Sequence, residues 1–139
     1  MTVVTRIIKI QSENENDMID ITENVSKAVF DSDVSNGNVT VFVKGSTGSI
    51  TTIEYEPGLI KDFPRMLSRI APKDLKYGHE EMWHDGNGHS HVKASLVGPS
   101  LTIPFNDRML CLGTWQQIVF VELDTRKRNR EIILQIVGE

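Results

Sequence analysis

Residues 101–137 decide the fold class, because they contain four short apolar runs: LTIPF at 101–105, RMLCL at 108–112, QIVFVEL at 117–123 and EIILQIV at 131–137. Most of these runs are rich in β-branched residues, and turn residues separate each from the next. Short strands at regular spacing are typical of a sandwich or a jelly-roll-like core. The carboxy-terminal part of the chain therefore predicts a mostly antiparallel sheet.

The same signal continues toward the amino terminus. Further strands are predicted at VVTRIIKI (3–10), VTVFV (39–43), residues 49–55 and HVKASLV (91–97). Two segments have helical spacing instead, namely residues 18–30, with Asp17 as the N-cap, and residues 59–70. Two helices are too few to serve as crossovers between so many strands. The pattern therefore favours an α+β fold over a doubly wound α/β fold: a β-rich, jelly-roll-like, mostly antiparallel sandwich with two helices.

Length and charge narrow the classes further. The chain has 139 residues and a mass of 15.7 kDa, so residues 1–139 are expected to form a single domain. Its 15 basic and 19 acidic residues give a net charge of −4, which argues against nucleic acid as a partner. No run is long and apolar enough to suggest a membrane span. The amino terminus lacks a signal-peptide pattern, and the single cysteine, Cys111, is expected to be buried and inert. A cytoplasmic location is expected.

All four histidines lie within thirteen residues, in and just after a loop over residues 78–90: His79, His84, His89 and His91. On a strand, His89 and His91 would point to one face, and the loop could fold His79 and His84 over them. Imidazole nitrogens with an oxygen from Asp85 or Glu54 would suit a divalent ion such as Zn²⁺. The spacing matches no tight metal motif, so surface histidines bonded to the backbone remain the alternative.

Two further segments could contact a phosphorylated ligand. Gly45–Ser49 combines glycines with three hydroxyls, including Ser46 and Thr47, but it lacks the features of a P-loop and also suits an ordinary hairpin turn. Lys93 alternates with His91 and Ser95, so this strand face is either a cationic part of a site or solvated.

Two turns near the carboxy terminus also carry candidate residues. Thr114, Trp115 and Gln116 could stack on a heteroaromatic ring and bond its edge, although Trp115 could equally be a core residue. The basic turn 126–130, which contains Arg128, is most often a solvated hairpin tip, and it would reach an active site only in an oligomer.

Several runs together resemble the YjbQ family, also named secondary thiamine-phosphate synthase enzymes. They are GSTGSITTIEYEPGL, HDGNGHSHVKASLVGPSLTIPF, LGTWQQIVFVELD and the closing VGE. The resemblance covers nearly the whole chain. It implies a β-rich α+β sandwich that assembles as a homotrimer, with polar sites near subunit boundaries and a histidine pocket.

Carried over by position, the family's Tyr-x-His element matches Tyr77 and His79, its Asp loop matches Asp85, and its His-x-Lys element matches His91 and Lys93. An acidic strand element matches Glu54, and the GTWQ element matches Gly113–Gln116. Many members have a histidine where this chain has Gly45, so His84 or His89 would have to replace it.

The resemblance implies coupling of a hydroxymethylpyrimidine diphosphate to a thiazole phosphate, with loss of pyrophosphate. A divalent metal (Zn, Mg or Mn) and no organic cofactor is expected. In this hypothesis His79, His89, His91 and Asp85 are metal ligands, and His79, His91, Lys93 and Glu54 are catalytic. Ser46, Thr47, Thr114, Trp115, Gln116 and Arg128 bind substrate. The alternatives are a metal-dependent phosphoester hydrolase and a non-catalytic metal- or nucleotide-binding trimer.

Overall fold

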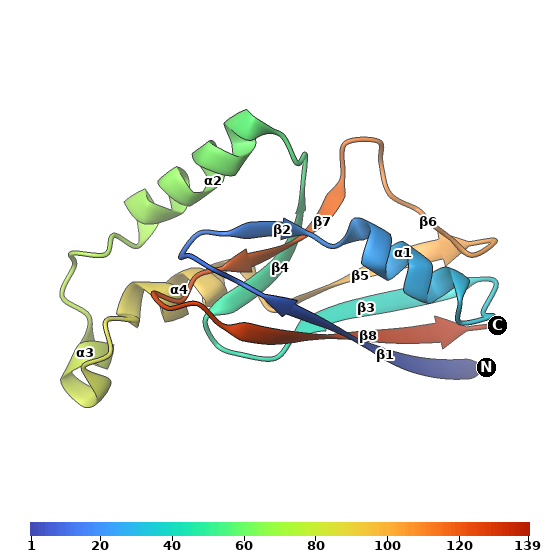
Figure 1. Ribbon diagram of the computed structural model, residues 1–139, viewed down its shortest axis with the longest axis horizontal. Helices are drawn as coiled ribbons and strands as arrows, with labels where there is room; N and C mark the ends of the chain where they lie inside the picture. Colours follow the sequence, from blue (N-terminus) through green and yellow to red (C-terminus); the bar gives the residue numbers. More distant parts are fainter.

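The computed structural model describes all residues, 1–139, as two antiparallel sheets and four helices (Figure 1). The α+β, β-rich and mostly antiparallel class predicted from the sequence is confirmed. No helix is both long enough and apolar enough to cross a membrane. The elements are β1 (Thr2–Gln11), β2 (Met18–Asp20), α1 (Thr22–Phe30), β3 (Gly37–Val43), β4 (Gly48–Ile53), α2 (Pro57–Ile70), α3 (Gly78–Trp83), α4 (Gly88–Val97), β5 (Ser100–Asn106), β6 (Met109–Leu110), β7 (Gln117–Glu122) and β8 (Asn129–Gly138).

Three neighbouring strands pass from one sheet to the other at a common edge. The five-stranded sheet has the order β1-β8-β3-β5-β6 and the three-stranded sheet the order β2-β7-β4. The chain therefore changes sheet between β1 and β2, between β3 and β4, and between β7 and β8. We call these three connections, residues 12–17, 44–47 and 123–128, the corner. Backbone hydrogen bonds join them, from Ser12 N to Arg128 O and from Leu123 N to Thr47 O, both 2.9 Å.

The core has two parts because the three-stranded sheet is covered on both faces. Along β7, Ile118 and Phe120 pack between the sheets with apolar residues of β3, β8 and α1. Val119 and Val121 point to the other face, where Leu67 of α2 and Ala94 of α4 cover them. This two-sided burial explains why β7 is apolar at successive positions rather than at alternate ones.

Residues 18–30 do not form one helix, as their spacing had predicted. Met18–Asp20 pair with β7 as strand β2, and the helix begins only at Thr22. Asp17 is not its N-cap, because its carboxylate accepts hydrogen bonds from Glu13 N and Asn14 N, both 2.8 Å. Asp20 Oδ1 accepts from Thr22 N instead, at 2.9 Å.

Residues 91–97 were predicted as a strand and are helical. Helix α4 begins where His91 N donates to Asn87 O at 3.0 Å. Its exposed apolar side chains, Val92 and Leu96, are four residues apart, while Lys93 and Ala94 face the core. The segment therefore follows a helical period, and its alternation of polar and apolar residues was misleading. With α3 inside the predicted loop, the helices number four rather than two.

Both predicted hairpin turns at the corner connect different sheets. The 44–47 segment joins β3 to β4, and the basic segment 126–130 leads from β7 into β8. Arg130 is buried and ion-paired with Glu122, so this basic segment is not a purely solvated tip. The expectation of a buried Cys111 was also wrong, since this residue is exposed.

Candidate functional site

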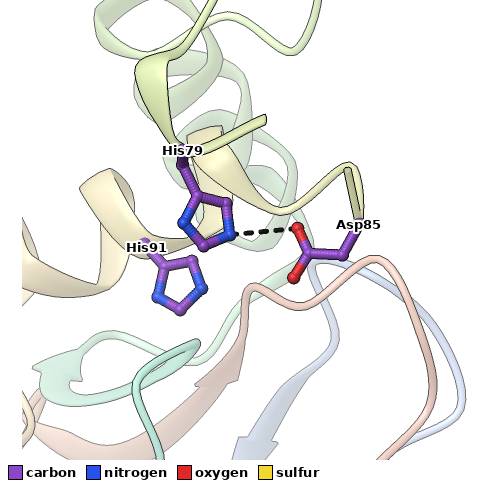
Figure 2. Close-up of side chains that lie close together, drawn as sticks. All are labelled: His79, Asp85 and His91. Carbon is purple, nitrogen blue, oxygen red and sulfur yellow. Dashed lines mark hydrogen bonds and ion pairs between the residues drawn. The ribbon is translucent and has the colours of Figure 1, made fainter. Parts of the chain in front are cut away.

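Three predicted site residues converge between α3 and α4. His79 comes from α3, Asp85 from the connecting loop and His91 from the first turn of α4 (Figure 2). His79 Nε2 lies 3.0 Å from Asp85 Oδ1, and the two imidazole rings have centroids 4.5 Å apart. One ligand atom from each of the three residues lies within 4.8 Å of the others. The structure thus brings these three of the predicted residues together.

Main-chain hydrogen bonds hold the loop that carries Asp85. The Glu80 carboxylate accepts from Gly86 N and Gly88 N, both at 2.8 Å, and these two bonds lower the pKa of Glu80. Asp85 Oδ1 accepts from Asn87 N at 3.0 Å. This bond is the main reason that the pKa of Asp85 is lowered, and His79 adds to it. The carboxylate is therefore held ionised and pointing toward both imidazoles.

Close packing fixes the start of α4 against the segment before α3. A Cβ at Gly88 would lie only 2.6 Å from the Cβ of Tyr77, so no other residue fits there without displacing the tyrosine. The Tyr77 hydroxyl donates to Pro72 O at 2.6 Å. Glycine in the HDGNGH motif thus sets the spacing between the helices that carry His79 and His91.

Asn87 connects this loop to the corner. Its side chain is buried and donates from Nδ2 to Asp124 Oδ1 at 3.3 Å, while its Oδ1 accepts from Ser90 Oγ and Thr125 N, both at 3.0 Å. Asp124 in turn accepts from Thr47 Oγ1 at 2.9 Å. Burial alone would raise the pKa of Asp124, but hydrogen bonds and the Arg128 guanidinium outweigh it and lower that pKa.

A polar cleft of about 400 Å³ lies between the cluster and the corner. No hydrophobic side chain lines it. The two predicted metal ligands that face it, Asp85 and His91, share its wall with Ser46, Thr47 and Arg128, which were predicted to bind substrate. The structure therefore brings together six of the predicted site residues, counting His79 beside the cleft.

The cluster fits a divalent ion in chemistry and in size. Two imidazoles and one carboxylate are a common ligand set for Zn²⁺ and related ions. Bonds of about 2.0–2.2 Å in a tetrahedral arrangement separate ligand atoms by roughly 3.4 Å. The His79–Asp85 distance of 3.0 Å and the 4.8 Å limit for all three atoms bracket that value. Small rotations of the side chains would complete the site and leave a coordination position open.

His89 and Lys93 do not join this cluster, although both were predicted to belong to the site. His89 is buried and bonded to Glu15 Oε1 at 2.5 Å, and Lys93 is buried with Nζ 3.3 Å from Ser68 Oγ. Desolvation lowers the pKa of Lys93. The reason for the misplacement is the helix: on a strand, positions 89, 91 and 93 share one face, whereas on a helix His91 turns away from the other two.

A second group of predicted residues lies at the far end of the three-stranded sheet. Gly48 pairs with Glu122 at the corner, and Ile53 pairs with Gln117 five residues further on, about 17 Å away along the strand. Glu54 follows Ile53, and the β6–β7 connection with its three predicted substrate residues precedes Gln117 (Figure 1). Within one chain, these residues lie away from the histidine cluster: Glu54, Thr114, Trp115 and Gln116.

Trp115 is neither a core residue nor part of the cleft. Its side chain is 69% exposed at the tip of the β6–β7 connection. Gln116 closes this turn, with its Oε1 accepting from Gly113 N at 2.8 Å. The GTWQ element thus shapes an exposed loop in the isolated chain.

Sequence reasoning missed three residues that organise the site: Glu80, Asn87 and Asp124. Asn87 lies within the histidine-rich run, and that position was the available signal. Glu80 acts through backbone amides and Asp124 through a buried side chain, and neither residue belongs to a recognisable sequence motif.

Comparisons with known proteins all indicate the same family, and each covers nearly the whole chain. A family model described as "UPF0047 protein YjbQ-like" matches residues 6–139. A UPF0047 protein of Methanothermobacter thermautotrophicus is 38% identical over 139 residues, covering all of this chain and 95% of that one. A solved YbjQ-like protein of unknown function from Sulfolobus solfataricus superposes with a TM-score of 0.89 at 30% identity, covering 99% of this chain and all of the other.

A crystal structure from Clostridium acetobutylicum, described as an uncharacterized conserved protein of the YjbQ/UPF0047 family, has a TM-score of 0.82 at 38% identity. It covers 94% of this chain and 99% of its own. The sequence motifs that resemble the family therefore lie inside a region that matches family members both in sequence and in fold. The chain belongs to the YjbQ/UPF0047 family.

Proposed function

We propose that the chain is a divalent-metal-dependent enzyme that acts on the phosphate or diphosphate ester of a small organic group, with thiamine-phosphate-synthase-like transfer as its reaction. The observation that carries the proposal is the convergence of His79, Asp85 and His91 at the wall of a polar cleft. Two imidazoles and an ionised carboxylate would hold the ion. When bound, the ion would supply positive charge that stabilises negative charge developing on phosphate oxygens.

The other cleft residues suit a phosphate group. Arg128 is half-exposed, and its pairing with Asp124 uses Nε and Nη2. Its remaining N–H groups are available to a ligand that enters the cleft. Ser46 adds a hydroxyl on a turn next to Gly45. Thr47 acts indirectly, because its hydroxyl is already bonded to Asp124 and Arg130.

The transfer reaction needs two events. The bond between the pyrimidine methylene carbon and the diphosphate oxygen breaks, and pyrophosphate leaves with both electrons. The thiazole nitrogen then bonds to that carbon. Between these two events, water must be excluded from the methylene carbon, because it would otherwise react there in place of the thiazole nitrogen. Glu54, Trp115 and Gln116 lie too far from the cleft to hold the thiazole within one chain, so we propose that a second copy in a homotrimer supplies them.

Hydrolysis is the second candidate, and the position of the same residues favours it. A single chain has the metal-ligand set and the polar cleft, whereas the residues expected to hold the acceptor lie at the far end of the three-stranded sheet. A hydrolase needs only water as the acceptor. In that case the P–O bond breaks, and the oxygen of water ends in the phosphate product.

Metal content of untagged protein is the first test, with a reductant present because Cys111 is exposed. We expect about one divalent ion per chain, and its loss in His79→Ala and in His91→Ala. His84→Ala is the matched control, since His84 is an exposed loop histidine outside the cluster. Absence of bound metal after incubation with Zn, Mn or Mg would refute the metal-dependent mechanism.

Product analysis then separates the candidates. Thiamine phosphate and pyrophosphate, formed only when the thiazole phosphate is present, establish transfer. Free phosphate that carries ¹⁸O from labelled water establishes hydrolysis. Ligand-dependent stabilisation without any product would instead identify a non-catalytic binding protein. Light scattering measures the oligomeric state, for which we expect a trimer.

A further inference from the structure

A second cleft adjoins the polar cleft and shares part of its wall. It has a volume of about 300 Å³, and Gly45, Ser46 and His91 line both clefts. The two are therefore neighbouring compartments of one depression. His91, one of the three clustered ligands, lies at their boundary.

The second compartment differs from the first in its chemistry. No Lys, Arg, Asp or Glu lines it, and most of its exposed lining is apolar, with contributions from Phe42, Ala94 and Pro99. Phe42 is 40% exposed despite its size, so its ring is available to a ligand. By contrast, aspartates and arginines line the polar cleft.

The backbone of this compartment is already fixed. Val43 N donates to Pro99 O at 2.9 Å, and Ile50 N donates to Gly98 O at 3.2 Å. These bonds attach the residues after α4 to the last residue of β3 and to the first half of β4. The walls would therefore need little rearrangement to receive a ligand, which lowers the entropic cost of binding.

We infer that the second compartment binds an uncharged planar ring, of about the size of one six-membered aromatic ring, joined to the phosphate or diphosphate group in the polar cleft. The inference rests on the proposed function and adds the place where the ring of the substrate binds and the residue that contacts it. A volume near 300 Å³ is at the lower end for small-molecule sites, so it suits one ring rather than several. The ring stacks on Phe42, whereas Trp115 lies at the far end of the sheet and does not reach this ring within one chain.

Binding of two phosphonates to the metal-loaded protein tests the inference without turnover. Methylphosphonate carries only the anionic group, and benzylphosphonate adds the ring. Calorimetry should show benzylphosphonate binding at least about tenfold more tightly, because the ring leaves water for an apolar wall. Phe42→Ala should reduce this ratio.

A pair of helix variants localises the effect. Ser95 lines the second compartment, so Ser95→Phe fills it and should bring the affinity ratio close to one while leaving methylphosphonate binding unchanged. Leu96→Phe is the matched control, because Leu96 is the next residue, is exposed and does not line this compartment. It should keep the wild-type ratio.

The outcomes distinguish the ring site from the proposed function. Equal affinity of the wild type for both phosphonates overturns the ring site and leaves the proposed function standing. If neither phosphonate binds, the proposed function fails. In that case benzyl alcohol tests the compartment by itself: shifts of the Phe42 and Ala94 amide signals that disappear in Ser95→Phe keep the ring site, and their absence overturns it.

Discussion

Two histidine–carboxylate pairs lie in the same segment of the chain and differ in their surroundings. In the first, the His79 and Asp85 side chains are 26% and 35% exposed, and His91 lies beside them. In the second, His89 is 2% exposed and bonded to Glu15, which reaches it from the connection between β1 and β2. The first pair has an open side toward a cleft, and the second has none.

Proximity in sequence therefore does not decide which histidines can bind a ligand. His89 and His91 are two residues apart on α4, so the helix turns one toward the protein interior and the other toward the cleft. A buried pair can stabilise the attachment of a helix, while an open cluster can accept an ion. Substitutions in each pair test this division of roles.

The largest effect is expected from His91→Ala. Loss of one of three ligand side chains should reduce metal affinity and turnover at least about 100-fold. The free energy of unfolding should change by less than about 1 kcal/mol, because His91 is half-buried and has no side-chain hydrogen bond within the protein. Metal analysis and urea unfolding measure the two quantities. Full metal content in this variant would refute the role of His91 as a metal ligand.

His89→Ala should show the opposite pattern. Removing the imidazole leaves a cavity and leaves the Glu15 carboxylate with only the exposed Lys73 as its partner, which together should lower the free energy of unfolding by about 2 kcal/mol. Metal content of the folded fraction should remain at the wild-type level. A double-mutant cycle with Glu15→Gln should give non-additive losses. A change in stability below about 0.5 kcal/mol would contradict a structural role for this pair.

Asp124→Asn tests the connection between the open cluster and the corner. The pKa of Asp124 is lowered in the folded protein, so its ionised form stabilises the fold fully above the unfolded value of about 3.8, and this stability is lost as pH falls through the folded value. We expect the variant to be less stable by roughly 2 kcal/mol at pH 7 and to show a flatter acid limb. Thermal unfolding between pH 2.5 and 7 measures this. Parallel curves for the two proteins would refute the assignment.

Lys93→Met should have the smallest effect. Burial lowers the pKa of Lys93, so the charged form is disfavoured in the fold, and replacing it should change stability at pH 7 by no more than about 1 kcal/mol. The wild type should gain stability relative to the variant as pH rises from 7 toward 10, because its unfolded chain then binds more protons than the folded one. Phosphonate affinity should stay unchanged. A tenfold loss of affinity at constant stability would restore the catalytic role expected from the sequence.

Much of the fold could be predicted from the sequence. Strands β1, β3, β5, β7 and β8 have β-branched or alternating residue patterns, and these patterns match the way the strands are buried in the folded protein. Helix α4 could not be predicted. Its HVKASLV run alternates like a strand, and only contacts distant in sequence, such as Glu15 with His89 and Ser68 with Lys93, show that a helical face is buried.

The candidate site was predicted in part for a similar reason. The clustering of His79, Asp85 and His91 within one loop and the following turn is local, so the sequence could indicate it. Thr47 and Arg128 lie beside this cluster only because segments from three parts of the chain meet at the corner. The separation of Glu54 and Trp115 from that corner depends on the register of β4 with β7, which no short motif encodes.

The corner also has a consequence for how the molecule opens. Three neighbouring strands change sheet there, and the bonds from Ser12 N to Arg128 O and from Leu123 N to Thr47 O join the crossing segments. These amides can exchange their hydrogens with solvent only when the two layers come apart. Their exchange should therefore be as slow as global unfolding allows, whereas amides in the α3–α4 loop should exchange sooner. The side of the cleft formed by the corner would then stay rigid in the folded protein. Local opening of the cleft would come only from the side formed by the α3–α4 loop.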